Sequence, residues 1–149
     1  IDANNGTFGQ HRDVIDQVFS NPTMEDIVAA LKQVETSTSS SSDTVSFCQE
    51  TLKQLNAMSP TSLKITLEQV RRAKRTNFIS LGDCLKMEYR MCQTLMKNTK
   101  SDFYEGIRAV LVDKDRNPSW NPPTLEEVSQ SEVDRHFVNL SEEEELHFD

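Results

Sequence analysis

The chain has 149 residues, of which 36% are hydrophobic and 27% are charged, and its formal net charge is −8 at pH 7. This length suffices for one folded domain with a hydrophobic core. The acidic balance argues against a general nucleic-acid-binding protein, which needs a basic face. We therefore expect no nucleic-acid partner. No apolar run approaches the roughly 20 residues that cross a bilayer, so we expect no membrane partner either.

The chain begins with Ile1 rather than methionine and shows no signal peptide, which favours a fragment or a processed chain. Its three cysteines, Cys48, Cys84 and Cys92, form no CxxC pair. We therefore expect free thiols rather than a disulfide framework, as is usual in a reducing compartment.

Residues 1–35 predict a loop followed by two short helices, because apolar residues recur there at helical spacing. Either Asn21 or Thr23 can cap the second helix. Residues 36–44 are almost entirely serine and threonine and predict a flexible surface loop. The elements expected before this loop are the loop Ile1–Gln10 and the helices His11–Phe19 and Met24–Val34.

Residues 45–140 predict the main helical region. Its first helix covers Val45–Met58, and Ser59 and Pro60 then end it and start the next helix, with serine as N-cap and proline at the first position. Ile65 lies off the apolar line of that next helix. The residues expected to face inward on the two helices are Phe47 or Cys48, Leu52, Leu55, Leu63, Leu67 and Val70.

Ser80–Asn98 is the longest predicted helix, and Ser80 with Asp83 resembles a capping box. Glu88 falls within the apolar stripe of this helix. A carboxylate there needs either an arginine partner, such as Arg108, or a place at the margin of the core. The stripe expected to face the core consists of Leu81, Cys84, Leu85, Cys92, Leu95 and Met96.

A short helix is predicted from Asp102 to about Val112, with Ser101 as its N-cap. The charged residues 113–116 end this helix, and the prolines around Trp120 exclude another helix there. Trp120 is the natural anchor of this proline-rich arm. The apolar residues that share one face of the helix are Phe103, Ile107, Val110 and Leu111.

Two further capping patterns, Thr124–Glu127 and Ser129–Glu132, come before a last helix that runs to about Asn139. Residues 141–149 contain four consecutive glutamates and predict a solvated acidic tail. No segment alternates with a period of two, so the fold class is all-α, with about seven helices. The inward residues of the last helix are expected to be Val133, Phe137 and Leu140.

Residues that could form an active site are scattered along the chain. His11, His136 and His147 lie in no HExxH or paired-ligand pattern, so we expect no metal site. There is no GxSxG motif and no glycine-rich loop that could hold a phosphate or an oxyanion. The basic cluster at residues 71–75 either complements the dipole at a helix C-terminus or forms an anion site, for example for a nucleotide phosphate. We assign no catalytic residue and no cofactor to this chain.

Four segments form a distinctive combination: MSPTSLKITLEQ (Met58–Gln69), LKMEYRMCQ (Leu85–Gln93), DFYEGIRAVLVDKDRNPSWNPP (Asp102–Pro123) and DRHFVNL (Asp134–Leu140). Together they resemble the C-terminal region of the 3-hydroxyisobutyryl-CoA hydrolase family, in the crotonase (enoyl-CoA hydratase/isomerase) superfamily. Val14–Gln33 is also similar, so the resemblance covers most of the chain.

The resemblance implies a mitochondrial hydrolase of valine catabolism that cleaves an acyl-CoA thioester, with acyl-CoA as substrate rather than cofactor. It also implies that the catalytic acids and oxyanion-hole amides lie in an N-terminal ββα-spiral core that this chain lacks. The helices would cover that core and close one side of the CoA cleft. The parent protein would then be the enzyme, and this chain alone would be inactive.

The same resemblance points to Lys114 as a contact for a CoA phosphate. In related hydratases, the helix aligned with Ser101–Val112 and the basic segment after it approach the CoA nucleotide. The alternative is that Lys114 only pairs with Asp113 or Asp115 at the surface.

Two other functions stay open at this point. The amphipathic helices and acidic surface also fit a free-standing helical interaction module, and a superfamily member other than a hydrolase fits the same motifs. Self-association is compatible with each of these readings.

Overall fold

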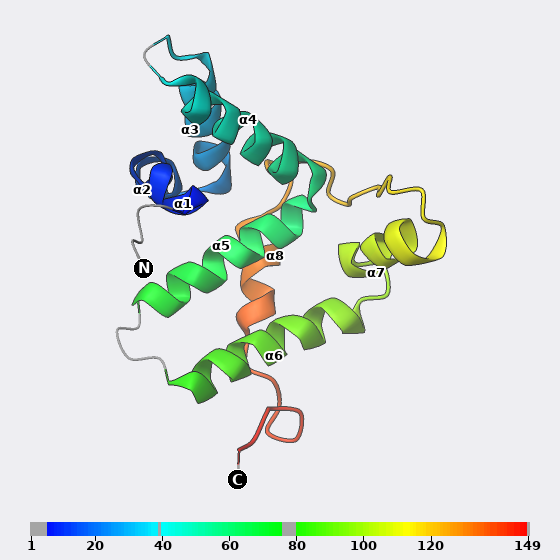
Figure 1. Cartoon of the computed structure of the whole chain (residues 1–149). Coiled ribbons are helices and arrows are strands. Elements are labelled where there is room, and N and C mark those ends of the chain that lie inside the picture. The colour runs from blue at the N-terminus through cyan, green and yellow to red at the C-terminus, as the bar shows by residue number, and fades with distance from the viewer. Residues whose placement is uncertain (1–5, 39, 76–79, 149) are drawn as a thin grey trace. The chain divides into compact units, whose positions relative to one another are not determined.

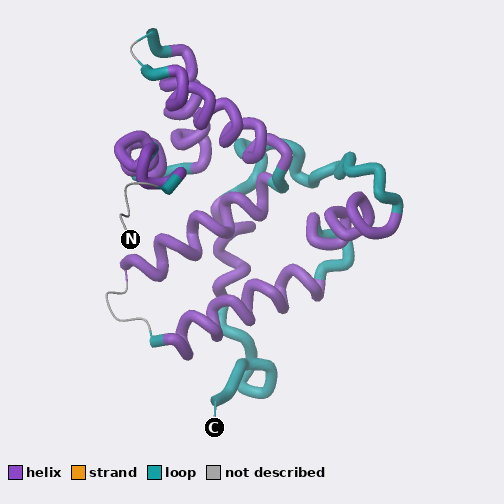
Figure 2. The backbone as a smooth tube through the Cα atoms, viewed as in Figure 1, coloured by secondary structure: helices purple, strands orange, loops and turns teal. Residues whose placement is uncertain are grey.

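The computed structural model describes residues 6–38, 40–75 and 80–148, and these residues form helices, turns and loops without a strand (Figures 1 and 2). The all-α prediction is therefore confirmed. The chain divides into two compact units, Ile1–Met58 and Ser59–Asp149, each described here by itself. Within the described residues, no helix is long and apolar enough to cross a membrane.

Unit 1 contains both predicted N-terminal helices and one helical turn that the sequence did not predict. That turn lies within the segment expected to be a loop, whose first five residues lie outside the described part. The serine-rich loop is shorter than predicted, because the helices on both sides extend into it. The elements are α1 (Thr7–Gln10), α2 (Arg12–Phe19), α3 (Met24–Thr36) and α4 (Ser42–Ala57).

Side-chain caps set the ends of these helices. Asn21 Nδ2 donates to the Val18 carbonyl (2.8 Å) and so caps the end of α2. Thr23 caps α3, because its Oγ1 accepts from the Asp26 amide at 3.0 Å. Ser41 caps α4 in the same way, which explains why this helix begins inside the serine-rich stretch.

The core of unit 1 lies between α2, α3 and α4. Of the two candidates for the inward position on α4, Cys48 is buried, whereas Phe47 stacks on His11 with ring centroids 4.4 Å apart. Burial raises the pKa of the Cys48 thiol, and the nearby Glu35 carboxylate raises it further. Cys48, Cys84 and Cys92 are all free thiols. The buried apolar side chains are Val18, Met24, Ile27, Leu31, Cys48 and Leu52.

Unit 2 is built on two long helices bridged by short ones. The C-terminal helical segment contacts both long helices, and α7 contacts the second of them (Figure 1). The elements are α5 (Pro60–Arg75), α6 (Leu81–Lys97), α7 (Asp102–Ile107), a π-helical turn (Arg108–Val112), α8 (Gln130–Asp134) and a 3-10 turn (Arg135–Phe137).

Two of the three predicted capping patterns in unit 2 are confirmed. Ser80 and Asp83 form a reciprocal capping box at α6, and Ser129 Oγ accepts from the Glu132 amide at α8 (3.1 Å). The Thr124–Glu127 pattern is wrong as a helix start, because these residues form a turn. There Thr124 Oγ1 instead donates to the Glu127 carboxylate at 3.2 Å.

The core of unit 2 uses different faces of α5 and α6 from those predicted. Ile65, which lies off the apolar line of α5, is 2% exposed, whereas Val70 is 60% exposed. On α6, Leu81, Leu85, Cys92 and Met96 are exposed. The predicted stripes are therefore wrong at these exposed positions, whereas Leu63, Leu67 and Cys84 are half-buried and Leu95 was correctly placed. The core consists of Ile65, Val128, Val133 and Phe137, with Met87, Met91 and Leu95 packed against it.

Competing apolar faces explain this error. Each long helix carries apolar residues over more than half of its circumference, so the spacing identifies an amphipathic helix but not which part of its apolar surface is covered. Residues 128–137 pack onto one part of that surface and leave the other part open. Glu88 lies at the exposed margin and accepts from Gln69 Nε2 (3.2 Å), so Arg108 is not its partner.

The predicted acidic tail is exposed at Glu142, Glu143 and Glu144, as expected, but it also contacts α6. Glu144 pairs with Lys97 (2.6 Å) and Glu145 pairs with Arg90 (2.7 Å). The Phe148 ring lies beside Gly82, where an added Cβ would be 3.4 Å from a ring carbon. Lysine and arginine on α6 thus offset the repulsion within the glutamate run.

We predict that truncating Ile65 destabilises unit 2 and that truncating Val70 does not. Ile65→Ala leaves a cavity in the core and should lower the free energy of unfolding by about 2–5 kcal/mol. Val70→Ala changes an exposed side chain and should alter it by less than about 0.5 kcal/mol. Urea unfolding followed by the fluorescence of Trp120 reports on unit 2. A larger loss for Val70→Ala than for Ile65→Ala would contradict the assigned core.

Candidate functional site

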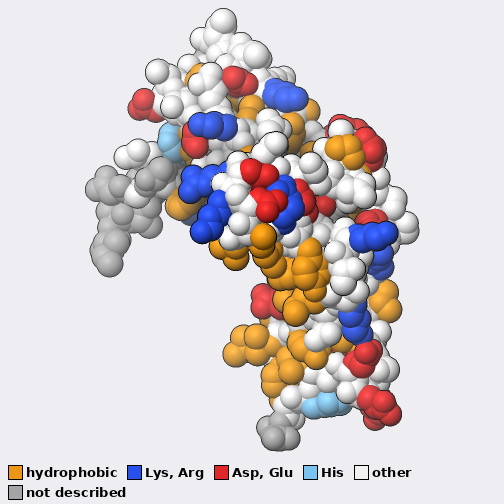
Figure 3. All heavy atoms as spheres, turned by 90° about the vertical axis from the view of Figure 1, so that its right-hand side faces the viewer, with side chains coloured by type: hydrophobic (Ala, Val, Ile, Leu, Met, Phe, Trp, Pro, Cys, Tyr) orange, Lys and Arg blue, Asp and Glu red, His pale blue; other side chains and the backbone are white. Residues whose placement is uncertain are grey.

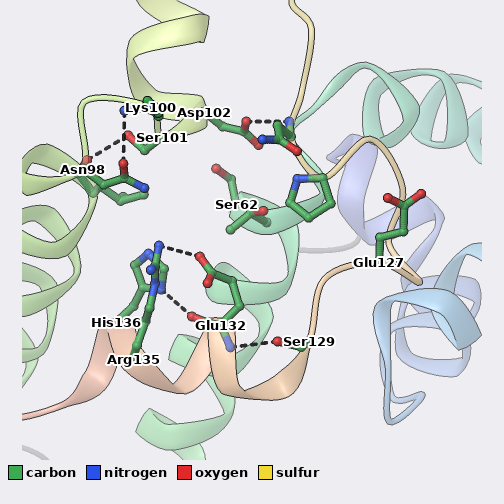
Figure 4. Close-up of a pocket in the computed structure, with 14 residues that line it drawn as sticks. Ser62, Asn98, Lys100, Ser101, Asp102, Glu127, Ser129, Glu132, Arg135 and His136 are labelled. Carbon is green, nitrogen blue, oxygen red and sulfur yellow. Dashed lines mark hydrogen bonds and ion pairs between the residues drawn. The ribbon is translucent and has the colours of Figure 1, made fainter.

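A polar pocket of about 420 Å³ lies in unit 2, where α5, α7 and α8 begin (Figure 4). Thr61 and Ser62 line it from the start of α5, and Ser101 and Asp102 line it from the start of α7. Ser101 occupies the N-cap position of α7, but its hydroxyl donates to the Leu95 carbonyl (2.8 Å) instead of capping the helix. The remaining lining residues are Leu95, Asn98, Lys100, Asn121, Pro122, Glu127, Ser129, Glu132, Arg135 and His136.

The buried carboxylate of Asp102 joins three segments at this pocket. One oxygen accepts from the Asn121 amide in the proline-rich arm at 2.9 Å. The other accepts from Ser59 Oγ at 2.5 Å, and Ser59 Oγ in turn accepts from the Ser62 amide at 3.1 Å, which caps α5. Asp102 therefore fixes the start of α5, the start of α7 and the arm relative to one another.

His136 is buried and serves the structure of α8. Its Nδ1 donates to the Glu132 carbonyl at 2.9 Å, and burial lowers the pKa of His136 below its usual value. The ring is therefore neutral at pH 7. Thr61 Oγ1 is buried and has no hydrogen-bond partner within the described part of the chain.

The carboxylates of the pocket form ion pairs or hydrogen bonds with neighbouring groups. Glu132 pairs with Arg135 (2.6 Å), and Glu127 accepts from the Thr124 hydroxyl. Among the described lining residues we find no serine hydrogen-bonded to His136, which a nucleophile and its base would require. The hydrogen bonds of the pocket therefore organise the helix starts.

A second cluster of charged side chains surrounds Arg108. Arg108 and its three acidic partners, Glu105, Asp113 and Asp115, are called the Arg108 clamp. The guanidinium forms a bidentate pair with Glu105, at 2.9 and 2.8 Å. Its Nη1 also donates to Asp113 (2.6 Å) and to Asp115 (2.7 Å). One cation thus gathers acids from α7 and from the charged segment that follows the π-helical turn.

The Arg108 clamp shifts the pKa values of its members. Hydrogen bonds from Arg108 and from the Ser119 amide lower the pKa of Glu105 to about 2. Hydrogen bonds from Arg108 and the Asn117 amide lower the pKa of Asp115, and the acidic partners raise the pKa of Arg108. All three groups therefore carry their charges throughout the physiological range.

The backbone around the Arg108 clamp is unusual. The Asp113 amide donates to the Arg108 carbonyl at 2.8 Å, a five-residue step that makes the turn π-helical. Lys114 and Arg116 then adopt left-handed conformations, with φ of 57° and 54°. Side chains with a Cβ rarely occupy that region, so the surrounding contacts must hold these two residues there.

Lys114 lies exposed on this segment. Asp113 and Asp115 both pair with Arg108, and the described part of the chain shows no ion pair between either of them and Lys114. The expected contact between Lys114 and a CoA phosphate stays a prediction.

Part of the basic cluster at residues 71–75 is bound by protein carboxylates. Arg72 pairs with Glu68 and Asp134, both at 2.7 Å, and lies 4.1 Å from the ring centroid of Phe137. Arg75 also reaches Glu68 at 3.4 Å. These contacts favour a structural role for the cluster over an anion site. Across the described residues, no three His, Cys, Asp or Glu side chains are grouped to hold a metal ion.

The sequence interpretation missed the Arg108 clamp and the role of Asp102. The three-residue spacing of Glu105 and Arg108 on one helix was a usable signal, since such pairs face each other. The contact between Asp102 and Ser59 joins residues 43 positions apart, and no local pattern reveals it.

We predict that Glu105 stabilises unit 2 in a pH-dependent way. Its pKa in the folded chain is about 2, against an ordinary value of 4.5. Its stabilisation is therefore complete above about pH 4.5 and is lost as the pH falls toward about 2. Glu105→Gln should be less stable than the wild type near neutral pH, and the difference should disappear near pH 2, as measured by urea unfolding.

Glu126→Gln is the matched control for this experiment, because Glu126 is exposed and makes no ion pair within the described residues. Its stability difference from the wild type should stay small at every pH. If the stability differences of the two variants depended equally on pH, Glu105 would not be the source of the pH-dependent stabilisation.

Comparisons with known proteins support the family resemblance. The sequence profile described as Enoyl-CoA hydratase/isomerase matches residues 2–137. The mitochondrial 3-hydroxyisobutyryl-CoA hydrolase of Gallus gallus is 45% identical over 131 residues, which cover 88% of this chain and 30% of that protein. The Homo sapiens enzyme of the same name is 43% identical with the same coverage. A probable 3-hydroxyisobutyryl-CoA hydrolase of Arabidopsis thaliana is 43% identical over 90% of this chain and 34% of its own.

Solved structures agree with the fold. An enoyl-CoA hydratase from Rhodobacter sphaeroides matches with a TM-score of 0.79 and 30% identity, over 97% of this chain and 38% of that one. A carnitinyl-CoA dehydratase from Mycobacterium thermoresistibile matches with a TM-score of 0.75 and 33% identity, over 92% and 35%. The chain thus spans about a third of the length of the relatives it matches. The chain belongs to the enoyl-CoA hydratase/isomerase family, and the relatives confirm its resemblance to 3-hydroxyisobutyryl-CoA hydrolases.

Proposed function

We propose that this chain is the C-terminal helical part of a 3-hydroxyisobutyryl-CoA hydrolase, an enzyme of valine catabolism that hydrolyses an acyl-CoA thioester. Relatives with that name, two of them called mitochondrial, are 43–45% identical, which supports both this activity and a mitochondrial location. The chain covers 30–34% of their length, so most of the enzyme would lie outside it.

The observation that carries this proposal is the open apolar surface of unit 2. Leu81 on α6 is 76% exposed, and Val110, Leu111 and Val112 of the π-helical turn are 58–68% exposed. Figure 3 shows hydrophobic side chains gathered on one face, next to charged groups. Isolated soluble proteins rarely expose so many large apolar side chains on neighbouring elements, so we infer that the parent protein covers this surface.

In this proposal, the chain shapes the enzyme rather than performing the chemistry. The acids of its polar pocket are engaged by structural partners, and its glycines form no loop for an oxyanion. The catalytic groups would lie in the rest of the parent protein. The helices would cover that core and one side of the CoA cleft, with Lys114 near a CoA phosphate.

A family member with another reaction is the competing function. Its support is the match to a hydratase and a dehydratase among solved structures. Those two are 30–33% identical, below the 43–45% of the proteins named hydrolases, so hydrolysis is the better-supported reaction.

We predict that this chain completes a hydrolase but not a hydratase. It would replace the matched region in two full-length recipients, the Homo sapiens hydrolase and the Rhodobacter sphaeroides hydratase. The first chimera should hydrolyse 3-hydroxyisobutyryl-CoA, and the second should not hydrate an enoyl-CoA. Each recipient without its matched region, and the 149-residue chain alone, serve as controls and should be inactive.

The outcomes of this experiment separate the functions. Activity of only the hydratase chimera would favour the competing reaction. Thioester hydrolysis by the isolated chain would contradict the proposal that the catalytic groups lie in the rest of the parent protein. An isolated chain that is monomeric and binds no hydrophobic dye would instead favour a free-standing interaction module.

A further inference from the structure

Helix α6 presents three sides, and the C-terminal tail, residues 141–148, lies on one of them (Figure 1). The side packed against the core carries Met87, Met91 and Leu95. The exposed apolar side carries Leu81, Leu85 and Met96. Spacings of four, four and seven residues place four further positions on a third side: Gly82, Lys86, Arg90 and Lys97. We call this third side the tail face, because the tail contacts all four positions.

Two ion pairs join the tail to this face, and the tail runs antiparallel to α6. Glu144 pairs with Lys97 at 2.6 Å, at the C-terminal end of the helix. Glu145 pairs with Arg90, whose Nε and Nη2 both lie 2.7 Å from the same carboxylate oxygen. The side chains of Arg90 and Glu145 are 22% and 12% exposed, so this pair is well enclosed. The tail face thus holds two adjacent carboxylates by two cations about two turns apart.

An aromatic contact completes the tail face at the start of α6. A Cβ at Gly82 would lie 3.4 Å from a carbon of the Phe148 ring, so a larger side chain at this position would meet the ring. Lys86 Nζ lies 5.8 Å from the centroid of the same ring, within the range of a cation–π contact. From Gly82 to Lys97 the tail face is about 22 Å long at 1.5 Å per residue.

The tail has a turn of its own that does not involve α6. The Glu144 and Glu145 amides donate to the Ser141 carbonyl at 3.0 and 2.9 Å. His147 Nε2 donates to the Glu142 carbonyl at 2.7 Å. These bonds lie within residues 141–147, so the segment that carries both carboxylates can form the turn without the helix.

The contacts between tail and helix are few and partly open to water. The Glu144 and Lys97 side chains are 50% and 52% exposed, and Phe148 is 51% exposed. Exposed ion pairs contribute at most about 1 kcal/mol each. A tethered segment nevertheless stays bound, because its effective concentration beside its own site is of the order of millimolar. A competing segment with the same chemistry can therefore replace the tail.

We propose that the tail face is a binding site for acidic peptide segments with an aromatic residue, and that the chain's own tail occupies it as a replaceable ligand. The matching segment has two adjacent glutamates and a phenylalanine three residues after the second, as in residues 144–148. A partner protein that carries such a segment displaces the tail and binds α6. The proposal makes no use of the reaction of the parent protein.

The test is a peptide titration of the isotope-labelled 149-residue chain, followed by NMR. The probe is a synthetic peptide with the sequence of residues 141–149. Glu144→Gln, Glu145→Gln and Phe148→Ala together give a tail-released variant in which α6 is unchanged. The peptide should shift the α6 amides of this variant with a Kd of about 1 mM or lower. The wild type should bind at least about tenfold more weakly, because its tethered tail competes.

Glu142→Gln combined with Glu143→Gln is the matched control. It removes the same two charges, but both glutamates are exposed and form no ion pair in the described part of the tail. This variant should keep its tail on α6 and bind the peptide as weakly as the wild type. Equal binding by the wild type and the tail-released variant would overturn the proposal, as would binding by the control as strong as that of the tail-released variant.

Charge exchange separates recognition from a damaged fold. In the tail-released variant, Arg90→Glu should abolish binding of the original peptide, and a peptide with Glu145→Arg should recover part of it, because opposite charges then meet again. Lys97→Glu with a Glu144→Arg peptide repeats the exchange at an exposed pair, where the fold does not depend on the side chain. Recovery in either exchange supports the site. Recovery in neither would overturn it.

Discussion

The buried carboxylate of Asp102 is the contact on which the architecture of unit 2 depends. It accepts from Ser59 at the start of α5 and from Asn121 in the proline-rich arm, while it also begins α7. A buried carboxylate is costly unless donors surround it, so these segments must meet for the carboxylate to be satisfied. The same contacts set the position from which α7 and the Arg108 clamp continue.

Ion pairs fix the loops and the C-terminal tail of unit 2. Arg108 binds three carboxylates, and Arg72 binds two while it also covers the ring of Phe137. The acidic tail is likewise held by Arg90 and Lys97. Partly exposed pairs of this kind contribute little individually, but networks that share one arginine lose less side-chain entropy for each contact. They specify the loops of this protein more than they stabilise its core.

The apolar surfaces connect this organisation to function. Residues 128–137 pack on one apolar face of α5 and α6. Val70, Leu81 and Met96, on the same two helices, stay exposed. Under the proposed function, the rest of the parent protein would cover this surface, since the chain spans about a third of the length of its relatives.

Local spacing in the sequence was sufficient for the helices, most of their caps, the all-α class and the family, because these depend on residues three or four positions apart or on short motifs. It did not decide which apolar face is buried: Ile65 lies in the core, with Met87 and Met91 packed against it, because residues 128–137 cover that face. It also did not reveal the contact of Asp102 with Ser59, 43 positions apart, or that of Arg90 with Glu145, 55 positions apart. Such contacts follow from the path of the whole chain, and only the folded structure brings the two groups into hydrogen-bonding distance.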